Sequence, residues 1–170
     1  LLDGEGGRTR AVGGIVRDTL LGISRENSEI DFATELTPDE VLARAERRGI
    51  ATHPTGIAHG TITLSIDHWL AEVTTLREDV ETDGRHAVVK FGTDWTRDAE
   101  RRDFTINALY ADMTGALYDP LGAAGDLAEP RIRFIGDADR RIAEDRLRVY
   151  RFFRFSASHG HEHFDSPGLV

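Results

Sequence analysis

Acidic residues and glycines near the N-terminus are the first residues whose types and spacing could do chemistry. Glu29 and Asp31 stand two apart on an expected strand, so both carboxylates point to one face. Such a pair suits two divalent cations roughly 3.5 to 4 Å apart. Gly13 and Gly14 precede them, between an expected strand and helix, where the backbone can approach a phosphate closely. An ordinary turn and a solvated acidic face are the plainer interpretations and stay open.

A third carboxylate could come from Glu72, on the polar face of an expected hairpin strand from Leu70 to Thr75. An exposed acid paired with a neighbouring arginine such as Arg77 explains this position equally well. The pattern alone leaves the two interpretations undecided.

Arginines, a carboxylate and an amide are concentrated between Arg101 and Leu109. The guanidinium groups of Arg101 and Arg102 suit phosphate oxygens, and Asp103 and Asn107 can hydrogen-bond ribose hydroxyls. The alternative is a salt-bridged helix start whose apolar residues enter the core.

Near the C-terminus, Asp145 and Arg148 are three apart on an expected helical face, with Glu144 placed to brace Arg148. Cytosine and adenine each offer an exocyclic amine beside a ring-nitrogen acceptor. An acceptor next to a donor therefore fits these two bases and leaves polar groups unpaired with uracil or guanine. A plain ion pair on a helix surface is the alternative.

Apolar periodicity and turn residues indicate the elements that must position these side chains. Expected strands are 9–12, 30–34, 61–66, 70–75, 87–91, 109–111, 116–118 and 133–135. Expected helices are 15–21, 37–48, much of 96–108, and about 137–157, and a glycine-punctuated loop is expected over 54–60.

Composition limits the class of protein. The 170 residues suit one domain with a helical extension. Apolar residues make up 39% of the chain, and no apolar run approaches the roughly 20 residues of a membrane span. Without cysteine there is no disulfide framework or Cys-based zinc site. No secretory signal is evident, so we expect a cytoplasmic protein without a membrane partner.

Charge is distributed unevenly along the chain. The net charge of −9 argues against a general nucleic-acid-binding surface. From Arg131 to Arg154, however, eight arginines face four acidic residues, so a polyanion is expected to bind the C-terminal end. His159, His161 and His163 form a tract that could bind metal, but a polar, mobile terminal segment is the preferred interpretation.

In order and spacing these segments resemble class II tRNA nucleotidyltransferases and bacterial poly(A) polymerases, of the DNA polymerase beta-like superfamily. The resemblance spans about residues 11–158. The matching segments are Val12 to Asp18, Ile30 to Thr34, Thr55 to Thr61, Glu72 to Arg77, Asp83 to Ala87, Arg101 to Ala108, Asp119 to Gly122, and Glu144-Asp145 with Arg148.

The resemblance implies an α/β (α+β) fold: a nucleotidyltransferase head with a small mixed sheet and helices over residues 1–136, then the start of an all-helical neck over 137–170. It implies that Gly13, Gly14 and Arg17 cradle a triphosphate and that Glu29 and Asp31 hold Mg²⁺, with Glu72 as a third catalytic acid. Arg101, Arg102, Asp103 and Asn107 are then expected around the ribose and phosphates, Asp145 and Arg148 at the base, and Arg151 and Arg154 near the triphosphate.

The activity that the resemblance implies is template-independent addition of C and A to the tRNA 3′ end from CTP and ATP, with no obligate protein partner. A poly(A) polymerase is the alternative within this class. The family's metal pair is normally Asp-x-Asp, whereas this chain has Glu29-Ile30-Asp31. Because a misplacement of about 1 Å at a reacting centre can cost on the order of 100-fold in rate, a non-catalytic nucleotide-binding module is the third interpretation.

Overall fold

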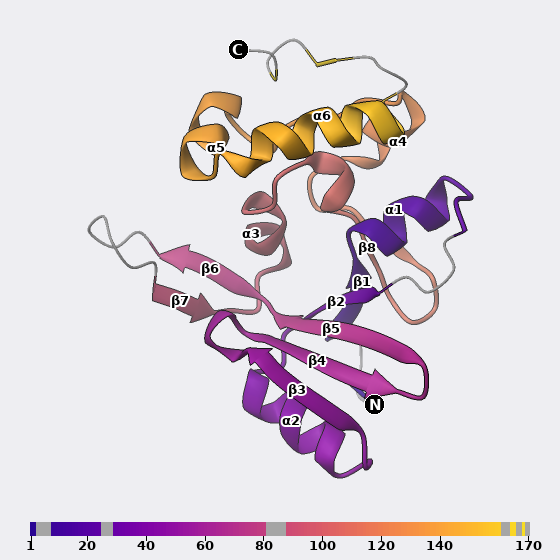
Figure 1. The fold of residues 1–170 in the computed structure, drawn as a ribbon, viewed down its shortest axis with the longest axis vertical. Coiled ribbons are helices and arrows are strands. Elements are labelled where there is room, and N and C mark those ends of the chain that lie inside the picture. Colours follow the sequence, from indigo (N-terminus) through magenta and orange to yellow (C-terminus); the bar gives the residue numbers. More distant parts are fainter. Residues whose placement is uncertain (3–7, 25–28, 81–87, 161–163, 166–167, 169–170) are drawn as a thin grey trace.

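A seven-stranded mixed sheet forms the centre of the molecule in a computed structural model that describes residues 1–2, 8–24, 29–80, 88–160, 164–165 and 168 (Figure 1). The strand order is β3-β4-β5-β2-β1-β8-β9. The strands are β1 (Thr9–Val12), β2 (Ile30–Thr34), β3 (Ala51–Gly56), β4 (Thr61–Ile66), β5 (Trp69–Thr75), β8 (Tyr110–Ala111) and β9 (Leu117–Tyr118). Strands β2 and β5 run parallel, and the other neighbours pair antiparallel.

Helices and a small hairpin complete the fold. The helices are α1 (Gly14–Leu20), α2 (Pro38–Glu46), α3 (Trp95–Glu100), α4 (Ala124–Ala128), α5 (Ala138–Glu144) and α6 (Leu147–His159), with 3₁₀ turns η1 (Ile57–His59) and η2 (Thr105–Asn107). Strands β6 (Arg77–Val80) and β7 (Val88–Phe91) form a separate antiparallel pair. This architecture confirms the expected α/β head fold.

Most expected elements form where local signals are strong. Strands β1, β2 and β4 have the predicted bounds. Helix α2 begins with the capping box that Thr37 and Glu40 make, with Pro38 at its first turn. The loop expected over 54–60 is wrong in its first part, because β3 continues to Gly56 alongside β4. Pairing with β4 overrides the Pro54 signal, since an edge strand tolerates proline.

Two predicted helices are shorter than expected. The first ends at Glu100 as α3, and the chain turns before the short η2. The second is divided into α5 and α6, with Asp145 between them in extended conformation. The Asp145 carboxylate accepts from the backbone N–H of Leu147, and side-chain competition of this kind for backbone groups interrupts helices.

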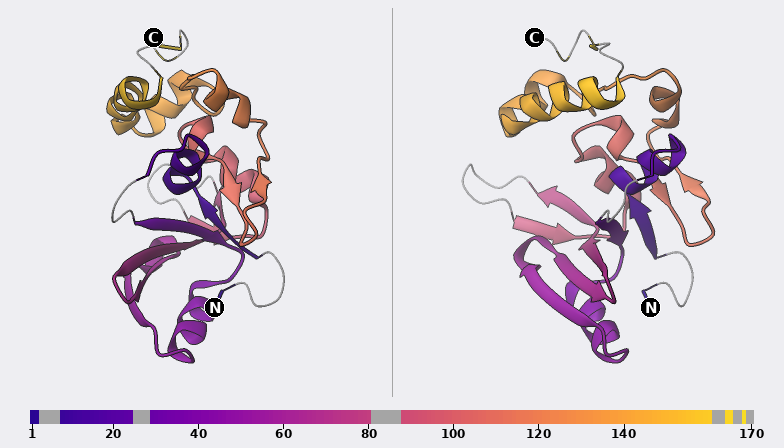
Figure 2. Two further views of the ribbon diagram at one scale, coloured as in Figure 1. Left: turned by 90° about the vertical axis from the view of Figure 1, so that its right-hand side faces the viewer. Right: turned by 45° about the vertical axis from the view of Figure 1, so that its right-hand side comes forward.

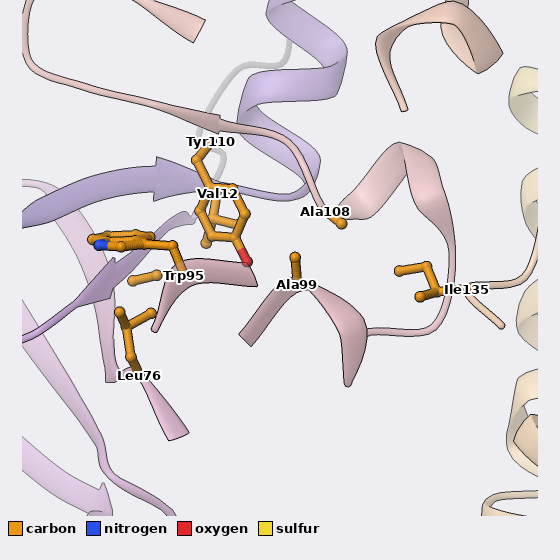
Figure 3. Packing of buried hydrophobic residues seen from close by; sticks show 8 residues of the cluster. Val12, Leu76, Trp95, Ala99, Ala108, Tyr110 and Ile135 are labelled. Atoms are coloured by element: carbon orange, nitrogen blue, oxygen red, sulfur yellow. The ribbon is translucent and has the colours of Figure 1, made fainter. Parts of the chain in front are cut away.

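An apolar cluster lies on each face of the sheet. Helix α2 covers one face of the outer strands, where Leu36, Val41, Ile62, Leu64 and Val73 are buried together. A second cluster lies between the sheet and α3, where Trp95 and Tyr110 meet edge to face at 5.4 Å (Figure 3). This second cluster fixes α3 against β1 and β8, and with it the arginines at the end of α3.

Helices α4, α5 and α6 lie together at the end of the molecule opposite α2 (Figure 2). Aromatic residues join them to the rest: Phe152 and Phe155 of α6 pack with Phe104 and Phe134 in one buried cluster. Residues from both sides of the expected boundary at 136 share this cluster, and the division into 1–136 and 137–170 stays a prediction. In the described part of the chain, no helix combines the length and apolarity needed to span a membrane.

Candidate nucleotide and metal site

The Gly13-Gly14 turn connects the end of β1 to the start of α1, as predicted. Gly13 has φ 73° and ψ −126°, a conformation that residues with a Cβ rarely adopt. Its N–H donates to the carbonyl of Leu109, 3.2 Å away, which ties the turn to the chain before β8. The backbone at this turn is therefore held in one shape and carries no side chain.

The acidic end of β2 lies next to this turn, because β1 and β2 are antiparallel neighbours with Ala11 opposite Phe32. On the other side of β2, Asp31 is directly opposite Glu72 of β5. Directly opposed residues of neighbouring strands project to the same face, and the two strands lie roughly 4.8 Å apart. Both side chains are exposed, so two carboxylates from two strands share one open surface.

Charged groups from three segments surround Asp31. Desolvation by the surrounding protein raises the pKa of Asp31 above its ordinary value, and repulsion from Glu72 and, more weakly, Glu29 adds to this rise. Arg102 lowers it in part. Glu29 itself is exposed just before β2. Crowded carboxylates of this kind favour a cation that would neutralise them.

The donor set suits a hard divalent ion without enclosing it. Carboxylate oxygens are the ligands that Mg²⁺ prefers, usually one or two of them together with phosphate oxygens and water. Among the residues that the structure describes, no group of three or more His, Cys, Asp or Glu side chains gathers closely enough to hold a metal ion by itself. A metal ion beside these carboxylates would thus complete its coordination with phosphate oxygens of a bound nucleotide or water.

Arg101 and Arg102 directly follow α3 and share one buried partner. Both guanidinium groups form ion pairs with Asp98, whose side chain is 1% exposed. The hydroxyl of Tyr110 also donates to Asp98, at 2.9 Å, and burial raises the pKa of Tyr110 so that the phenol keeps this proton. The alternative of a salt-bridged helical segment is therefore correct in part, and Asp98 is a site residue that sequence reasoning missed.

Arg17, Asn107 and Asp103 bind one another, which their spacing in the sequence did not indicate. The Arg17 guanidinium donates to the side-chain oxygen of Asn107 at 2.7 Å and to Asp18 at 2.8 Å. The Asn107 amide donates to Asp103 at 3.1 Å. Arg17 and Asn107 are buried, so Arg17 lies behind the Gly13-Gly14 turn in an internal network rather than projecting freely into solvent.

The predicted base-reading pair has a different geometry from the one expected. Asp145 caps α5 in extended conformation, so it does not share a helical face with Arg148. The expected brace is present: Glu144 accepts from Arg148 at 2.7 Å. Arg141 joins this cluster to the end of α3, since it pairs with Glu144 and donates to the carbonyls of Arg101 and Arg102. Arg148 is thereby held close to the arginine pair that follows α3.

The remaining C-terminal candidates divide into paired and open groups. Arg151 donates to Asp103 at 2.6 Å, whereas Arg154 is exposed and lies over the ring of Phe155 at 5.0 Å. His161 and His163 lie outside the described residues. The expectation of a mobile histidine tract is wrong for His159, whose side chain is 4% exposed and lies 3.3 Å from Asp18. No sequence signal marked this contact.

Comparison with known proteins gives the family. The profile described as "Poly A polymerase head domain" matches residues 9–133. The chain is 48% identical over 147 residues to "CCA tRNA nucleotidyltransferase 1, mitochondrial" of Danio rerio, covering 86% of this chain and 34% of that protein. It is 42% identical over 151 residues to "CCA-adding enzyme" of Oceanobacillus iheyensis, covering 88% and 36%. The chain thus spans about a third of the length of these relatives.

Solved structures agree with the sequence matches. The Bacillus stearothermophilus CCA-adding enzyme in complex with CTP superposes with a TM-score of 0.76 at 35% identity, covering 87% of this chain and 34% of that one. A tRNA nucleotidyltransferase complexed with a primer tRNA and an incoming ATP analog gives 0.74 at 28% identity, covering 95% and 44%. With its mixed sheet, its Gly-Gly turn and its opposed acidic strands, this chain belongs to the poly(A) polymerase head domain family, among the relatives that include CCA-adding tRNA nucleotidyltransferases.

Proposed function

We propose that the protein adds C and A to the 3′ end of tRNA from CTP and ATP, as a template-independent nucleotidyltransferase. The observation that carries the proposal is the direct opposition of Asp31 and Glu72 beside the Gly13-Gly14 turn. A triphosphate that follows the open backbone of the turn meets two carboxylates at one end. The names of the relatives support the choice of CTP, ATP and tRNA.

Glu29 and Asp31 are the side chains that would hold Mg²⁺, with Glu72, directly opposite Asp31, as a third acid. When bound, Mg²⁺ lowers the pKa of an attacking hydroxyl and stabilises negative charge on the leaving group. The reaction is in-line attack by the RNA 3′-hydroxyl oxygen on the α-phosphorus, with cleavage of the bond to pyrophosphate. The chain's own contribution is to align the phosphates at Gly13 and Gly14 opposite these acids.

The sugar and phosphates are assigned to the segment after α3. We assign Arg101 and Arg102 to the phosphates, because Asp98 holds both guanidinium groups in place while they keep partial exposure. Asp103 and Asn107 are assigned to the ribose, and Arg17, Arg151 and Arg154 to the phosphate side. Arg17 acts through Asn107 and the turn, since its burial prevents direct approach of a ligand in this arrangement.

Base selection is assigned to Arg148 and Asp145. Arg148 presents donors that Glu144 orients, and Asp145 is an exposed acceptor one segment earlier. A cytosine or adenine edge pairs with this combination, whereas uracil and guanine leave polar groups unpaired. One protein surface can thereby select both nucleotides.

The test is to incubate the protein with Mg²⁺ and a tRNA that lacks its 3′ end, in one reaction with CTP alone and in a second with ATP alone. Incorporation of C supports CCA addition. Incorporation from ATP alone with rejection of CTP would instead identify a poly(A) polymerase, the second candidate, which the family's name supports. No incorporation from either nucleotide would contradict both enzymatic assignments.

Glu29 decides between an enzyme and a non-catalytic nucleotide-binding module. Turnover of the natural protein is compared with that of its Glu29→Asp variant under the same conditions. Equal turnover means that the longer Glu29 side chain is accommodated. A gain on the order of 100-fold, from a natural protein with almost no turnover, would mean that the metal site has decayed.

The cytoplasm is the proposed compartment, in keeping with a chain that contains no cysteine. A head over 1–136 followed by a neck from 137 is the proposed organisation. In this arrangement the arginine-rich stretch from Arg131 to Arg154 supplies positive charge for RNA at the C-terminal end, while the head remains acidic.

A further inference from the structure

Besides its buried aromatic contacts, helix α6 makes two well-separated polar contacts with the head. At its middle, the Arg151 guanidinium binds the Asp103 carboxylate. At its last residue, the His159 ring nitrogen Nε2 lies 3.3 Å from the Asp18 carboxylate on α1. This contact is a hydrogen bond in the tautomer that has the ring proton on Nε2, which donates to the carboxylate oxygen. The two attachments are eight residues apart, about 12 Å along the helix axis.

The two attachments are connected to each other through the interior of the head. Asp18 contacts Arg17, Arg17 contacts Asn107, and Asn107 contacts Asp103. Asp103 in turn binds Arg151 on α6. We call this closed series of contacts the α1–α6 circuit. Its members are Asp18, Arg17, Asn107, Asp103, Arg151 and His159.

Burial limits how far the side chains of the circuit can move. The side chains of Arg17 and His159 are each 4% exposed, and Asp18 and Asn107 are also buried. A buried ion pair has little freedom, because losing one partner leaves an uncompensated charge. The ring of Phe155 fills the space inside, with the guanidinium groups of Arg17 and Arg151 at 5.1 and 5.4 Å from its centroid.

Arg17, a member of the circuit, lies in α1, the helix that begins at the Gly13-Gly14 turn. The circuit also contains two residues of α6, the helix that carries Arg148. Arg148 is in the first turn of α6. A tilt of α6 about the Arg151 attachment would displace Arg148 at one end and His159 at the other. The contact at His159 therefore restrains the C-terminal end of α6. It thereby also restrains Arg148, the proposed base-reading arginine, at the N-terminal end of the same helix.

We propose that His159 and Asp18 are positioning residues for base selection, which fix the direction of α6 and so the place of Arg148 relative to the phosphate-binding turn. The part of this proposal that concerns base selection rests on the proposed function. The other, geometric part, that His159 and Asp18 fix the direction of α6, depends only on contacts within this chain.

The absence of cysteine from the sequence makes the geometric part measurable. Spin labels are attached at Leu20→Cys on α1, which is 50% exposed, and at Ala157→Cys, an exposed position near the His159 end of α6. The distance distribution is recorded by pulsed electron resonance. His159→Phe keeps a ring and removes the donor. His159→Gln keeps a donor at similar reach, and Arg131→Gln removes a different ion pair, with Asp165.

We expect His159→Phe to broaden or shift the distance distribution, while His159→Gln and Arg131→Gln leave it unchanged. The affinity of the same variants for CTP and UTP is measured by calorimetry. His159→Phe should lower the preference for CTP by about tenfold, within the ~100-fold that a full 1 Å misplacement costs. His159→Gln should restore it.

An unchanged distance distribution in a folded His159→Phe variant overturns the proposal, whatever the nucleotide affinities. A changed distribution with an unchanged CTP preference overturns the role in base selection. If the natural chain binds CTP and UTP equally, the proposed base selection fails, and a changed distribution still supports the geometric part. If His159→Phe does not fold, Asp18→Asn replaces it, and the same outcomes apply.

Discussion

Asp31 on β2 lies directly opposite Glu72 on β5, in a parallel pairing that extends from Ile30 opposite Ala71 to Thr34 opposite Thr75. This pairing brings the two carboxylates to one face of the sheet, next to the Gly13-Gly14 turn. Their mutual repulsion is one cause of the raised pKa of Asp31. The arrangement stores unfavourable electrostatic energy that a bound cation would remove.

Replacement of Glu72 by Gln should lower the pKa of Asp31, because one source of repulsion is removed. A carboxyl NMR titration of the metal-free protein checks this. In the presence of CTP, the same variant should bind Mg²⁺ at least about 100-fold more weakly, since even residues that only support metal ligands contribute 10- to 100-fold. Glu46→Gln, an equal charge change on the exposed side of α2, serves as the control. An unchanged Mg²⁺ affinity would remove Glu72 from the metal site.

The two glycines of the turn should respond differently to alanine. Gly13→Ala should lower the free energy of unfolding by about 1–3 kcal/mol, because its φ of 73° is strained for any residue with a Cβ. Gly14→Ala should leave stability unchanged or raise it by up to about 1 kcal/mol, since the new Cβ would lie at an ordinary 3.6 Å from Arg17 Nη2. Urea unfolding measures both. Equal losses would mean that backbone conformation is not what distinguishes them.

Asp98→Asn should be strongly destabilising, by about 3–5 kcal/mol, because it leaves two arginines facing a neutral, buried group. Asp94→Asn is the matched control in the same helix: it makes the same charge change at the N-cap, where Asn caps as well as Asp. Thermal and urea unfolding compare the two variants. A similar small loss from both would show that the buried ion pairs contribute little.

Asp98 should also make stability depend on pH. Burial by itself raises the pKa of Asp98, but the positive charges of Arg102 and Arg101 outweigh it, so the pKa lies below its ordinary value. A group whose pKa is lower in the folded state contributes stability above its unfolded pKa, about 3.9, and loses it as pH falls through the folded pKa. Unfolding free energies measured from pH 6 down to pH 3 should fall less steeply in Asp98→Asn than in the natural protein.

Glu144→Gln should reduce the preference for CTP over UTP, because Arg148 loses the carboxylate that orients it. Arg140 and Arg141 also pair with Glu144, so the variant leaves three arginines without this charge. Asp139→Asn makes the same charge change on an exposed position of α5 and should leave the preference intact. Competition binding with the two nucleotides gives the ratio directly. A preserved ratio in Glu144→Gln would assign base selection to other residues.

Local structure was largely predictable from the sequence. The bounds of β1, β2 and β4 follow from alternation and turn residues, and α2 is specified by its capping box. These signals act over a few residues, within which backbone preferences and hydrogen bonds are decided. The break at Asp145 was not predictable, since one side chain competing for a backbone N–H changes the balance by little energy.

The sequence by itself determined which residues are available for chemistry: the Gly13-Gly14 turn, the acids at 29, 31 and 72, and the arginines after α3. Only the tertiary structure decided which of them meet. The pairing of Asp31 with Glu72 depends on strand register, where a shift of one residue would turn one carboxylate to the other face. Arg17 meets Asn107 from 90 positions away, and Asp18 meets His159 from 141. Contacts at such separations form because buried charges must find partners, and only the packed core determines which partners lie within reach.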